Sequence, residues 1–571
     1  MGKNIVVIGG VALGPKAACR CLRLAPDTNL TLVDENTFIS YGGCGLPYYV
    51  SGEIQALDAL RSTNYQVVRD PAFFAKMKGF RVMTQTRATA IDRAKQCVHV
   101  KHLDSNTEED LPYDSLVLAT GAKPRIPPFE GKDLRNIYTL TKLEDADQIR
   151  KNCESGAVTD AVIIGGGFIG LEAAVALADM WGIHTTVLEM DNTLMRAVLP
   201  ETLGKVAEAD MVKHGVTVLT SEKTLKFTGE NGAVTAVVTD KRTIKAQLVI
   251  IATGFIPNGQ LAKDAGLPTL GNGAIIVDAF MRTEDPHIYA GGDCASIVNI
   301  ITGKHGYLPL GSMSNRQGRV IGTNIAGGSQ TFPGFVGTWA VKLFDMSIAA
   351  TGLTIDRARM EGFDAISVTV EQLDRAHFYP EKDMMALEIV VDKKTRRVLG
   401  MQGASANGQG LKARIDAVAA LLQCAKPTVA DVSNLEVGYA PPFAAAMDVV
   451  NVAGNVAENV LDGHFTAING IDFADLWEKR SDNTIFFIDA RPKGAGDALA
   501  QKHPEWHPIP LEQIEAELPT IPKDRDIALI CNTGLRSYES LLILQRHGYT
   551  RIKNAMGGMQ ALKQMGLDPK A

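Results

Sequence analysis

Two cysteines of this chain stand in loops whose composition could support sulfur chemistry. Cys44 lies in the glycine-rich segment "ISYGGCGLPYY", a few residues beyond an acidic strand end, and Cys531 opens another loop far along the chain. The eight cysteines are scattered, and no C-x-x-C pair occurs among them. A disulfide formed by Cys44 therefore has to involve a sulfur atom that arrives from outside its own loop.

The second loop runs Cys531-Asn-Thr-Gly-Leu-Arg536, between a predicted buried strand and a predicted helix. Such a turn curls backbone N–H groups around the sulfur at a helix N-terminus, which stabilises a thiolate or a persulfide. Four residues separate the cysteine from the arginine, one fewer than in the phosphate loop of tyrosine phosphatases, so the tighter loop favours sulfur. We expect an accessible Cys531 thiolate that carries sulfane sulfur, with Arg536 favouring its negative charge.

Two glycine turns are placed to bind dinucleotides. The stretch "KNIVVIGGVALGPKAACRCLRLAP" predicts a strand, a glycine turn and a helix, whose N-terminus favours a pyrophosphate. Valine replaces the middle glycine of G-x-G-x-x-G. The next strand, "NLTLVDE", ends in two acids, of which we favour Glu35 as the ribose ligand. The candidate residues of this turn are Gly9, Val11, Ala12 and Gly14.

The pattern recurs in "DAVIIGGGFIGLEAAVALADMWGIHTTVLEM", where Gly165, Gly167 and Gly170 give the full fingerprint. Glu189 closes the following strand. A carboxylate there accepts hydrogen bonds from the ribose hydroxyls and repels a 2′-phosphate, so the sequence predicts NADH in preference to NADPH.

Three further segments connect the two turns. "LVLATGAKP" (116–124) and "VIIATGFIPN" (249–258) are predicted buried strands that end in the same Ala-Thr-Gly turn, and Thr120 and Gly121 of the first are candidate cofactor-binding residues. "DPHIYAGGDCASI" (285–297) places Gly292 and Asp293 after a strand, where the carboxylate could hold a flavin's ribityl hydroxyl.

These segments together resemble the flavoprotein disulfide reductases that bind two dinucleotides. The resemblance implies an α/β protein with two Rossmann-like domains and an α+β dimerisation domain in a homodimer. We expect a discontinuous FAD domain at 1–150 and 254–326, an NAD domain at 151–253 and the dimerisation domain at 327–452. Two-cysteine members carry a C-x4-C pair, but Tyr49 stands five residues after Cys44. The single cysteine before Leu-Pro-Tyr resembles the coenzyme A disulfide and NADH-dependent persulfide reductases.

That family implies roles for residues in and beyond the cysteine segment. Cys44 is the expected redox thiol, although Ser40-Tyr-Gly-Gly43-Cys44 departs from the usual Ser-Phe-x-x-Cys. "AHFYPEKD" and "VGYAPPFAAAMD" supply tyrosines that the family presents to the facing subunit; the alternative is that both are buried and structural. Three basic residues on one face of the first helix could clamp coenzyme A phosphates, or simply form a solvated stripe. These candidates are Tyr379 and Tyr439, then Lys16, Arg20 and Arg23, with Ser40 and Gly43 near the substrate.

A different unit follows a short linker at 453–465. "NTIFFIDARPKG", the Cys531 loop and "NAMGGMQAL" resemble a rhodanese domain of α/β fold, expected at 466–571. An accessory module without catalysis is the alternative, although such modules commonly lack the cysteine.

Composition narrows the possible functions. A chain of 571 residues is too long for a single core, and a net charge of −6 gives no reason to expect nucleic acid as a partner. No apolar run reaches membrane-spanning length and no signal peptide is visible. The scattered cysteines indicate a reducing, cytoplasmic setting. The cysteine pattern also predicts no metal site.

These observations predict an FAD-dependent oxidoreductase that uses NADH to reduce coenzyme A persulfide, polysulfide or coenzyme A disulfide through Cys44, with the rhodanese domain handling sulfane sulfur. One rival is an NADH oxidase or peroxidase that cycles through a cysteine sulfenic acid. The other is a flavin-based redox sensor that signals through a bound partner. The sequence does not distinguish among the sulfur donors.

Overall fold

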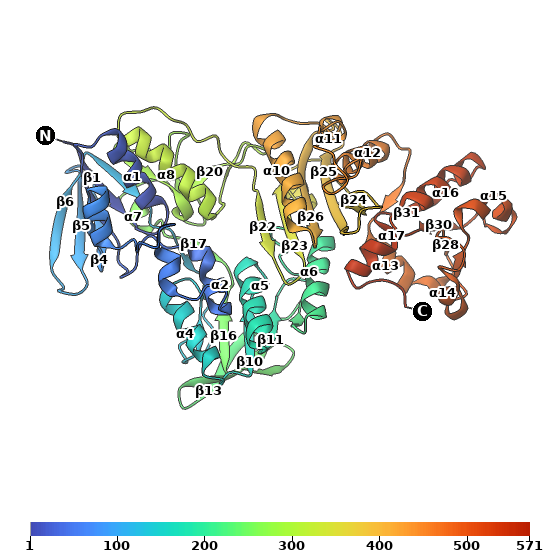
Figure 1. Ribbon diagram of the computed structural model, residues 1–571, viewed down its shortest axis with the longest axis horizontal. Coiled ribbons are helices and arrows are strands. Elements are labelled where there is room, and N and C mark those ends of the chain that lie inside the picture. The colour runs from blue at the N-terminus through green and yellow to red at the C-terminus, as the bar shows by residue number, and fades with distance from the viewer. Residues whose placement is uncertain (1, 571) are drawn as a thin grey trace. The chain divides into compact units, whose positions relative to one another are not determined.

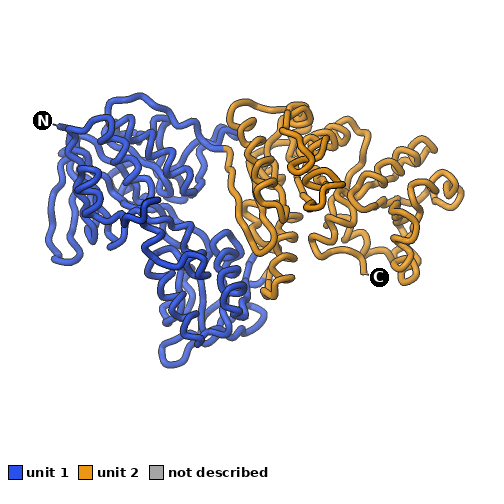
Figure 2. Tube along the Cα trace, viewed as in Figure 1, with its two compact units in different colours: residues 1–190, 222–335 blue, residues 191–221, 336–571 orange. Residues whose placement is uncertain are grey.

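The computed structural model describes residues 2–570, which form two compact units. Unit 1 comprises residues up to 190 together with 222–335, and unit 2 comprises 191–221 together with 336 onward (Figure 2). No helix among the described residues is long and apolar enough to cross a membrane.

The first sheet of unit 1 is wholly parallel. Its strands, in the order β19-β7-β1-β2-β3, are β19 (Ile288–Ala290), β7 (Ser115–Leu118), β1 (Asn4–Ile8), β2 (Asn29–Val33) and β3 (Arg81–Met83). Helices α1 (Leu13–Leu24) and α8 (Gly311–Ile325) pack against each other beside it (Figure 1). Because β19 follows the second sheet in sequence, this domain is built from two separate stretches of chain. Its central strands β1 and β7 are continuous apolar runs buried in the core, as is typical of a parallel sheet that is covered on both faces.

The second sheet of unit 1 repeats this arrangement. Strands β11 (His184–Leu188), β10 (Asp160–Ile164), β16 (Leu248–Ile251) and β9 (Ile137–Tyr138) pair in that order, all parallel. Helix α5 (Phe168–Val175) follows the glycine turn, and α4 (Leu143–Glu154) precedes β10. Two antiparallel sheets flank the nucleotide folds: β4 (Thr86–Asp92), β5 (Cys97–His102) and β6 (Glu108–Pro112), then β13 (Thr224–Glu230), β14 (Ala233–Thr239) and β15 (Thr243–Lys245).

The second stretch of unit 2, from residue 336 onward, begins with a five-stranded antiparallel sheet. The order is β22 (Trp339–Lys342), β23 (Ser347–Gly352), β26 (Val398–Ser405), β25 (Met384–Asp392) and β24 (Ala365–Leu373). Helix α10 (Gly408–Cys424) packs on β23 and β26, and α12 (Val449–Leu461) packs on β24 and β25. Helix α6 (Glu201–Lys213) also contacts β26, so the stretch expected to form the NAD domain contributes residues to both units.

The C-terminal part of unit 2 is built on a third parallel sheet. Strands β27 (Ala467–Ile468), β31 (Ile552–Ala555), β30 (Asp526–Ile530), β28 (Ile485–Asp489) and β29 (Trp506–Pro508) pair in that order. Helices α13 (Gly470–Glu478), α16 (Leu535–Arg546) and α17 (Gly558–Gln564) surround them (Figure 1). Phe473, Phe487 and Trp506 fill the core as edge-to-face aromatic pairs.

Candidate functional site

The two glycine turns of unit 1 have nearly the same geometry. Gly9 and Gly165 adopt φ values of +110° and +109°, which favour glycine. A Cβ atom on Gly9 would lie 2.0 Å from the Ala119 carbonyl oxygen, and one on Gly165 would lie 2.5 Å from that of Ala252. Each turn therefore presses against its own Ala-Thr-Gly segment, so the repeated sequence corresponds to a repeated contact.

The third glycine of each turn allows the helix to pack closely. A Cβ atom on Gly14 would lie 1.9 Å from the Gly9 carbonyl oxygen, and one on Gly170 would lie 2.0 Å from that of Gly165. The middle position differs, because a Cβ on Gly167 would meet no described atom within 4 Å. The fold itself thus tolerates Val11 in the first copy, and a glycine is needed there only where a ligand approaches the backbone.

The acids after the second strand of each fold hold these turns. The Gly10 N–H donates to Asp34 Oδ2 at 2.7 Å, and the Gly166 N–H donates to Glu189 Oε2 at 2.8 Å. Glu35 instead accepts from Arg87 Nε at 2.8 Å and is half exposed. The sequence analysis missed the role of Asp34, and Glu35 stays available as the ribose ligand that we predict.

The flavin-side candidates of unit 1 are also held in place. Thr120 Oγ1 donates to the Asn258 carbonyl at 2.7 Å, and Gly121 adopts φ +65°. The Gly292 N–H donates to Gln317 Oε1 at 2.6 Å. Burial raises the pKa of the Asp293 carboxyl, while a 3.4 Å hydrogen bond from Ser314 opposes the rise. A half-buried carboxylate at a tight glycine turn fits the ribityl ligand predicted here.

Cys44 stands at the surface of unit 1, in a short 3₁₀ turn (Gly43–Gly45) that leads into α2 (Leu46–Ser51). Ser40 adopts φ +52°, and its N–H donates to the Gly10 carbonyl at 2.8 Å, which links the cysteine loop to the first glycine turn. A Cβ on Gly43 would meet no described atom within 4 Å, so this side of the loop is open.

Two carboxylates act on the Cys44 thiol. Desolvation by the surrounding loop raises its pKa, and the negative charges of Glu172 and Asp293 raise it further. Glu172 lies on α5, and burial raises its own pKa to about 7. The sequence analysis did not identify Glu172, because nothing local in "GLEAAVAL" connects it with a loop more than a hundred residues earlier.

The basic residues of α1 do not share one environment. Lys16 and Arg23 are exposed, whereas Arg20 is half-buried and donates through Nε to Thr323 Oγ1 at 3.0 Å. Lys16 and Arg23 are available for an anion, and Arg20 also has a structural role that joins α1 to α8.

Cys531 lies in unit 2 within the cradle that the loop sequence predicts. The Gly534 N–H donates to its sulfur at 3.1 Å, and the Ser537 hydroxyl donates at 3.3 Å. Arg536 is exposed, so in this structure Ser537 supplies the donor that we expected from the arginine. The expectation of an accessible thiolate is wrong, because Cys531 is only 2% exposed.

The two candidate tyrosines are not buried side chains. Tyr439 is 53% exposed, and Tyr379 is half-buried with the Arg375 guanidinium 5.9 Å from its ring centre. Phe378, Phe443 and Met447, from the same two segments, are also exposed. The alternative in which both tyrosines are structural core residues therefore fails for Tyr439.

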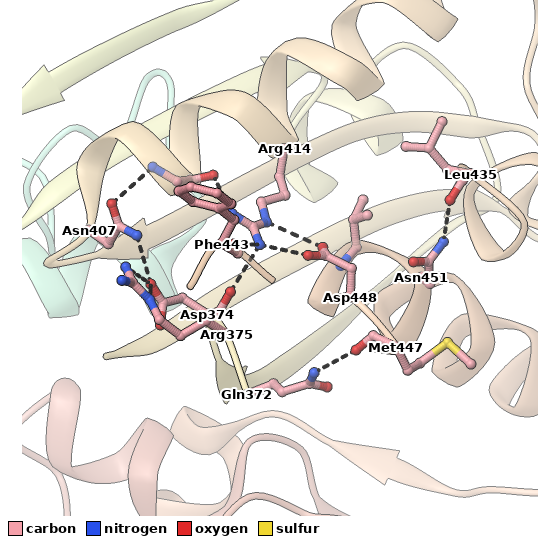
Figure 3. Close-up of polar contacts among 12 residues, drawn as sticks. Gln372, Asp374, Arg375, Asn407, Arg414, Leu435, Phe443, Met447, Asp448 and Asn451 are labelled. Atoms are coloured by element: carbon pink, nitrogen blue, oxygen red, sulfur yellow. Dashed lines mark hydrogen bonds and ion pairs between the residues drawn. The ribbon is translucent and has the colours of Figure 1, made fainter. Parts of the chain in front are cut away.

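A buried polar network fixes the segments that carry these tyrosines (Figure 3). Arg414 on α10 donates to both carboxylate oxygens of Asp448, at 2.6 and 3.2 Å, and to the carbonyls of Asp374 and Phe443. Asp374 in turn pairs with Arg375 at 2.7 Å. Because removing one partner of a buried ion pair costs about 3–5 kcal/mol, this network holds both segments firmly on the sheet.

One cluster was missed by the sequence analysis, which predicts no metal site. Cys97, His99 and Asp110 bring three potential ligand atoms within 4.8 Å of one another on β5 and β6. The His99 Nδ1 and Asp110 Oδ1 atoms are 2.6 Å apart and share a hydrogen bond, which accounts for their proximity.

Two dinucleotide turns and one exposed thiol in unit 1 define an oxidoreductase that exchanges electrons among a nicotinamide, a flavin and sulfur. A family model described as pyridine nucleotide-disulphide oxidoreductase matches residues 3–318, its dimerisation domain matches 338–450, and a rhodanese-like domain matches 472–565. The chain belongs to the pyridine nucleotide-disulphide oxidoreductase family. The predicted fold class and the predicted FAD and nicotinamide cofactors are thereby confirmed.

Individual relatives agree with this family. The solved structure titled as an NAD-dependent persulfide reductase from A. fulgidus is 39% identical, with a TM-score of 0.91, and the match covers 98% of this chain and 99% of that one. The NAD(P)H coenzyme A polysulfide/persulfide reductase of Pyrococcus horikoshii is 35% identical over 80% of this chain and 98% of its own length. A Methanocaldococcus jannaschii NADH oxidase is 30% identical over 79% of this chain and 98% of its own length.

Proposed function

We propose that this enzyme uses NADH to reduce the persulfide or the disulfide of coenzyme A at Cys44, and that Cys531 supplies sulfane sulfur. The observation that carries the proposal is the coexistence of an exposed Cys44 beside the first glycine turn with a cradled Cys531 in a rhodanese-like domain. The names of the persulfide reductase relatives support the same substrate class.

The glycine turns fit the two dinucleotides. FAD would be held by Gly9, Gly14, Glu35 and Asp293, and NADH by Gly165, Gly170 and Glu189, since each turn leaves N–H groups at a helix start and an acid at a strand end. When bound, the flavin accepts hydride from NADH and supplies two electrons to sulfur.

At Cys44 the thiolate attacks the inner sulfur of R–S–S–H. A Cys44–S–S–R bond forms, the S–S bond of the substrate breaks, and the outer sulfur leaves as HS⁻. Two electrons then cleave the mixed disulfide, which regenerates the Cys44 thiolate and releases R–S⁻. Lys16 and Arg23 are proposed to bind the phosphates of coenzyme A, because exposed cations on one helix face favour binding of phosphate groups.

We also propose that the chain acts as a cytoplasmic homodimer. Phe378, Tyr439, Phe443 and Met447 expose apolar surface on the dimerisation domain, and such a patch marks an interface. Tyr379 and Tyr439 would then serve Cys44 of the facing subunit. All eight cysteines are free, as in proteins of a reducing compartment.

The experiment is steady-state NADH oxidation with four acceptors: coenzyme A persulfide, coenzyme A disulfide, polysulfide and hydrogen peroxide. The proposal expects persulfide or coenzyme A disulfide to give the highest kcat/KM. A higher kcat/KM for peroxide, or fast oxygen consumption, would favour the alternative hypothesis of an NADH oxidase or peroxidase. Similarity to the Methanocaldococcus NADH oxidase is consistent with that alternative. No turnover with any acceptor would favour a redox sensor. An oxidase of this architecture is expected to use a histidine near the flavin. His99 and His102, the histidines nearest in sequence to the first glycine turn, instead pair with Asp110 and Glu109.

A further inference from the structure

A cavity of about 740 Å³ lies within unit 2, where the Cys531 loop faces the dimerisation domain. One wall is formed by the end of β24, by α12 and by Tyr439. The other is formed by Thr533, Gly534 and Leu535 of the cysteine loop, with Met556 and Gly557 beside them. Because the Gly534 N–H donates to the Cys531 sulfur at 3.1 Å, the sulfur lies directly behind this second wall.

One residue that lines this space has an unpaired polar atom. Asn554 is fully buried and lines the cavity. Its Nδ2 donates to the Gly534 carbonyl at 3.1 Å, while its Oδ1 has no hydrogen-bond partner in the described part of the chain. A buried acceptor without a hydrogen-bond partner is unfavourable, so the cavity wall next to the loop favours a ligand that brings a donor group.

Glu371 is the second unexplained group in the cavity. It is 6% exposed near the end of β24, where its Oε2 accepts from Gln564 Nε2 at 3.3 Å. A Cβ atom on Gly557 would lie 2.9 Å from Glu371 Cγ, so the carboxyl-bearing side chain packs on the backbone next to the loop. Burial raises the pKa of Glu371 to about 8, and within residues 2–570 no charged neighbour offsets that rise.

No other described residue that lines this cavity carries a carboxyl group that could take the place of Glu371. Arg375 is ion-paired with Asp374, and His377 is exposed at the wall. Tyr439 and Tyr538 contribute hydroxyl groups, and α12 contributes uncharged side chains. From α17 the contact is the neutral amide of Gln564. Glu371 is therefore the carboxylic acid of this wall.

We propose that the cavity binds the persulfide of a small thiol, and that Glu371 of the dimerisation domain protonates the thiolate that leaves when Cys531 takes up sulfane sulfur. This inference rests on the proposed sulfur-carrying function of Cys531. It makes the rhodanese-like site composite, because its acid comes from a domain that precedes it in the chain.

The step balances as follows. The Cys531 thiolate attacks the outer sulfur of R–S–S–H, so a Cys531 Sγ–S bond forms, the donor S–S bond breaks, and R–S⁻ leaves. Glu371 gives its proton to R–S⁻, which departs as R–SH. The Cys531 persulfide then loses its proton to Glu371, which leaves Cys531–S–S⁻ and a protonated carboxyl. One thiolate charge is present at the start and at the end, and no outside oxidant or reductant is needed.

A comparison of two sulfur donors distinguishes a proton-donating role of Glu371 from a structural one. Cysteine persulfide leaves as a strongly basic alkyl thiolate that needs a proton, whereas thiosulfate leaves as the more weakly basic sulfite. The full-length FAD-bound enzyme, without NADH, is mixed with each donor, and the added sulfur on the Cys531 peptide is followed by mass spectrometry. The variant is Glu371→Gln, which preserves shape and a partner for Gln564. The control is Glu388→Gln, a buried carboxyl of β25 bonded by Thr202 and outside the cavity wall.

Glu371→Gln should slow sulfur uptake from cysteine persulfide on the order of 100-fold, the usual contribution of a general acid, and leave uptake from thiosulfate nearly unchanged. Glu388→Gln should leave both rates nearly unchanged. In the wild type, the ratio of the persulfide rate to the thiosulfate rate should fall above about pH 8, as Glu371 loses its proton. The wild-type profile tests the idea even if the variant folds poorly.

Equal rates for Glu371→Gln and wild type with persulfide, or equal losses with both donors, would overturn the role of Glu371 while leaving Cys531 as a sulfur carrier. Wild-type Cys531 that takes sulfur from neither donor would instead overturn the proposed relay itself, and the inference with it.

Discussion

The two cysteines that could react with sulfur have opposite surroundings. Cys44 is exposed, and desolvation together with the carboxylates of Glu172 and Asp293 raises its pKa, which disfavours the thiolate. Cys531 is buried, and the Gly534 N–H and the Ser537 hydroxyl both donate to its sulfur. The two sulfurs thus differ in their polar surroundings, which supports the different tasks that we propose for them: Cys531 carries sulfane sulfur, and Cys44 reacts with the coenzyme A substrate.

The largest expected effect comes from removing the sulfur of Cys44. Cys44→Ser should retain bound flavin and its bleaching by NADH, because the dinucleotide turns are untouched, yet it should lose all thiol-directed turnover. The measurements are flavin absorbance at single turnover and steady-state NADH oxidation with coenzyme A persulfide. Turnover at the wild-type rate would show that Cys44 is not the redox thiol.

Cys531→Ser sharpens the same comparison from the other side. Coenzyme A persulfide, which reaches Cys44 unaided, should still be reduced at close to the wild-type rate. The rate of polysulfide reduction should fall by about tenfold or more. A bulky donor needs Cys531 to pass on its sulfur, and loss of a catalytic group lowers a rate by at least that factor. Equal loss for both substrates would place Cys531 in the reductive site, and no loss for either would leave its domain structural.

A smaller effect is expected at Glu189, which also holds its glycine turn. Wild-type kcat/KM should favour NADH over NADPH by about 100-fold, since placing like charges together costs several kcal/mol. Glu189→Gln keeps an acceptor for the Gly166 N–H and removes the charge, so the ratio should narrow. A wild-type enzyme that prefers NADPH would contradict the proposed role of Glu189 in nucleotide selection.

The smallest expected change is the effect of Glu172 on the Cys44 thiol. Removing its negative charge favours the thiolate, so Glu172→Gln should lower the pKa of Cys44 and speed its alkylation below pH 9. Glu172 is ionised only above its own pKa of about 7, so the difference from wild type should vanish below that pH. Glu154→Gln, an exposed carboxylate paired with Arg150, is the control. An unchanged pH dependence of alkylation in Glu172→Gln would show that Glu172 does not affect the pKa of Cys44.

How much the sequence could predict depends on how local each constraint is. The glycine turns were predictable because a positive φ at Gly165 and close packing at Gly170 are set within a few residues. The loop of Cys531 was predictable for the same reason, except that Ser537 and not Arg536 reaches the sulfur. The effect of Glu172 on Cys44 and the contact of Glu371 with Gln564, 193 residues away, were not predictable, since burial and tertiary packing create them.

The central claim is that Cys531 carries sulfane sulfur, whereas Cys44 forms the mixed disulfide with coenzyme A. The most direct test exposes the oxidised, full-length protein without NADH to polysulfide and, separately, to coenzyme A persulfide, and maps the modified cysteines by mass spectrometry. We predict one added sulfur on the Cys531 peptide after polysulfide, and a coenzyme A mixed disulfide on the Cys44 peptide after coenzyme A persulfide. Added sulfur that maps to Cys44 in both samples, with Cys531 unmodified, would contradict the account.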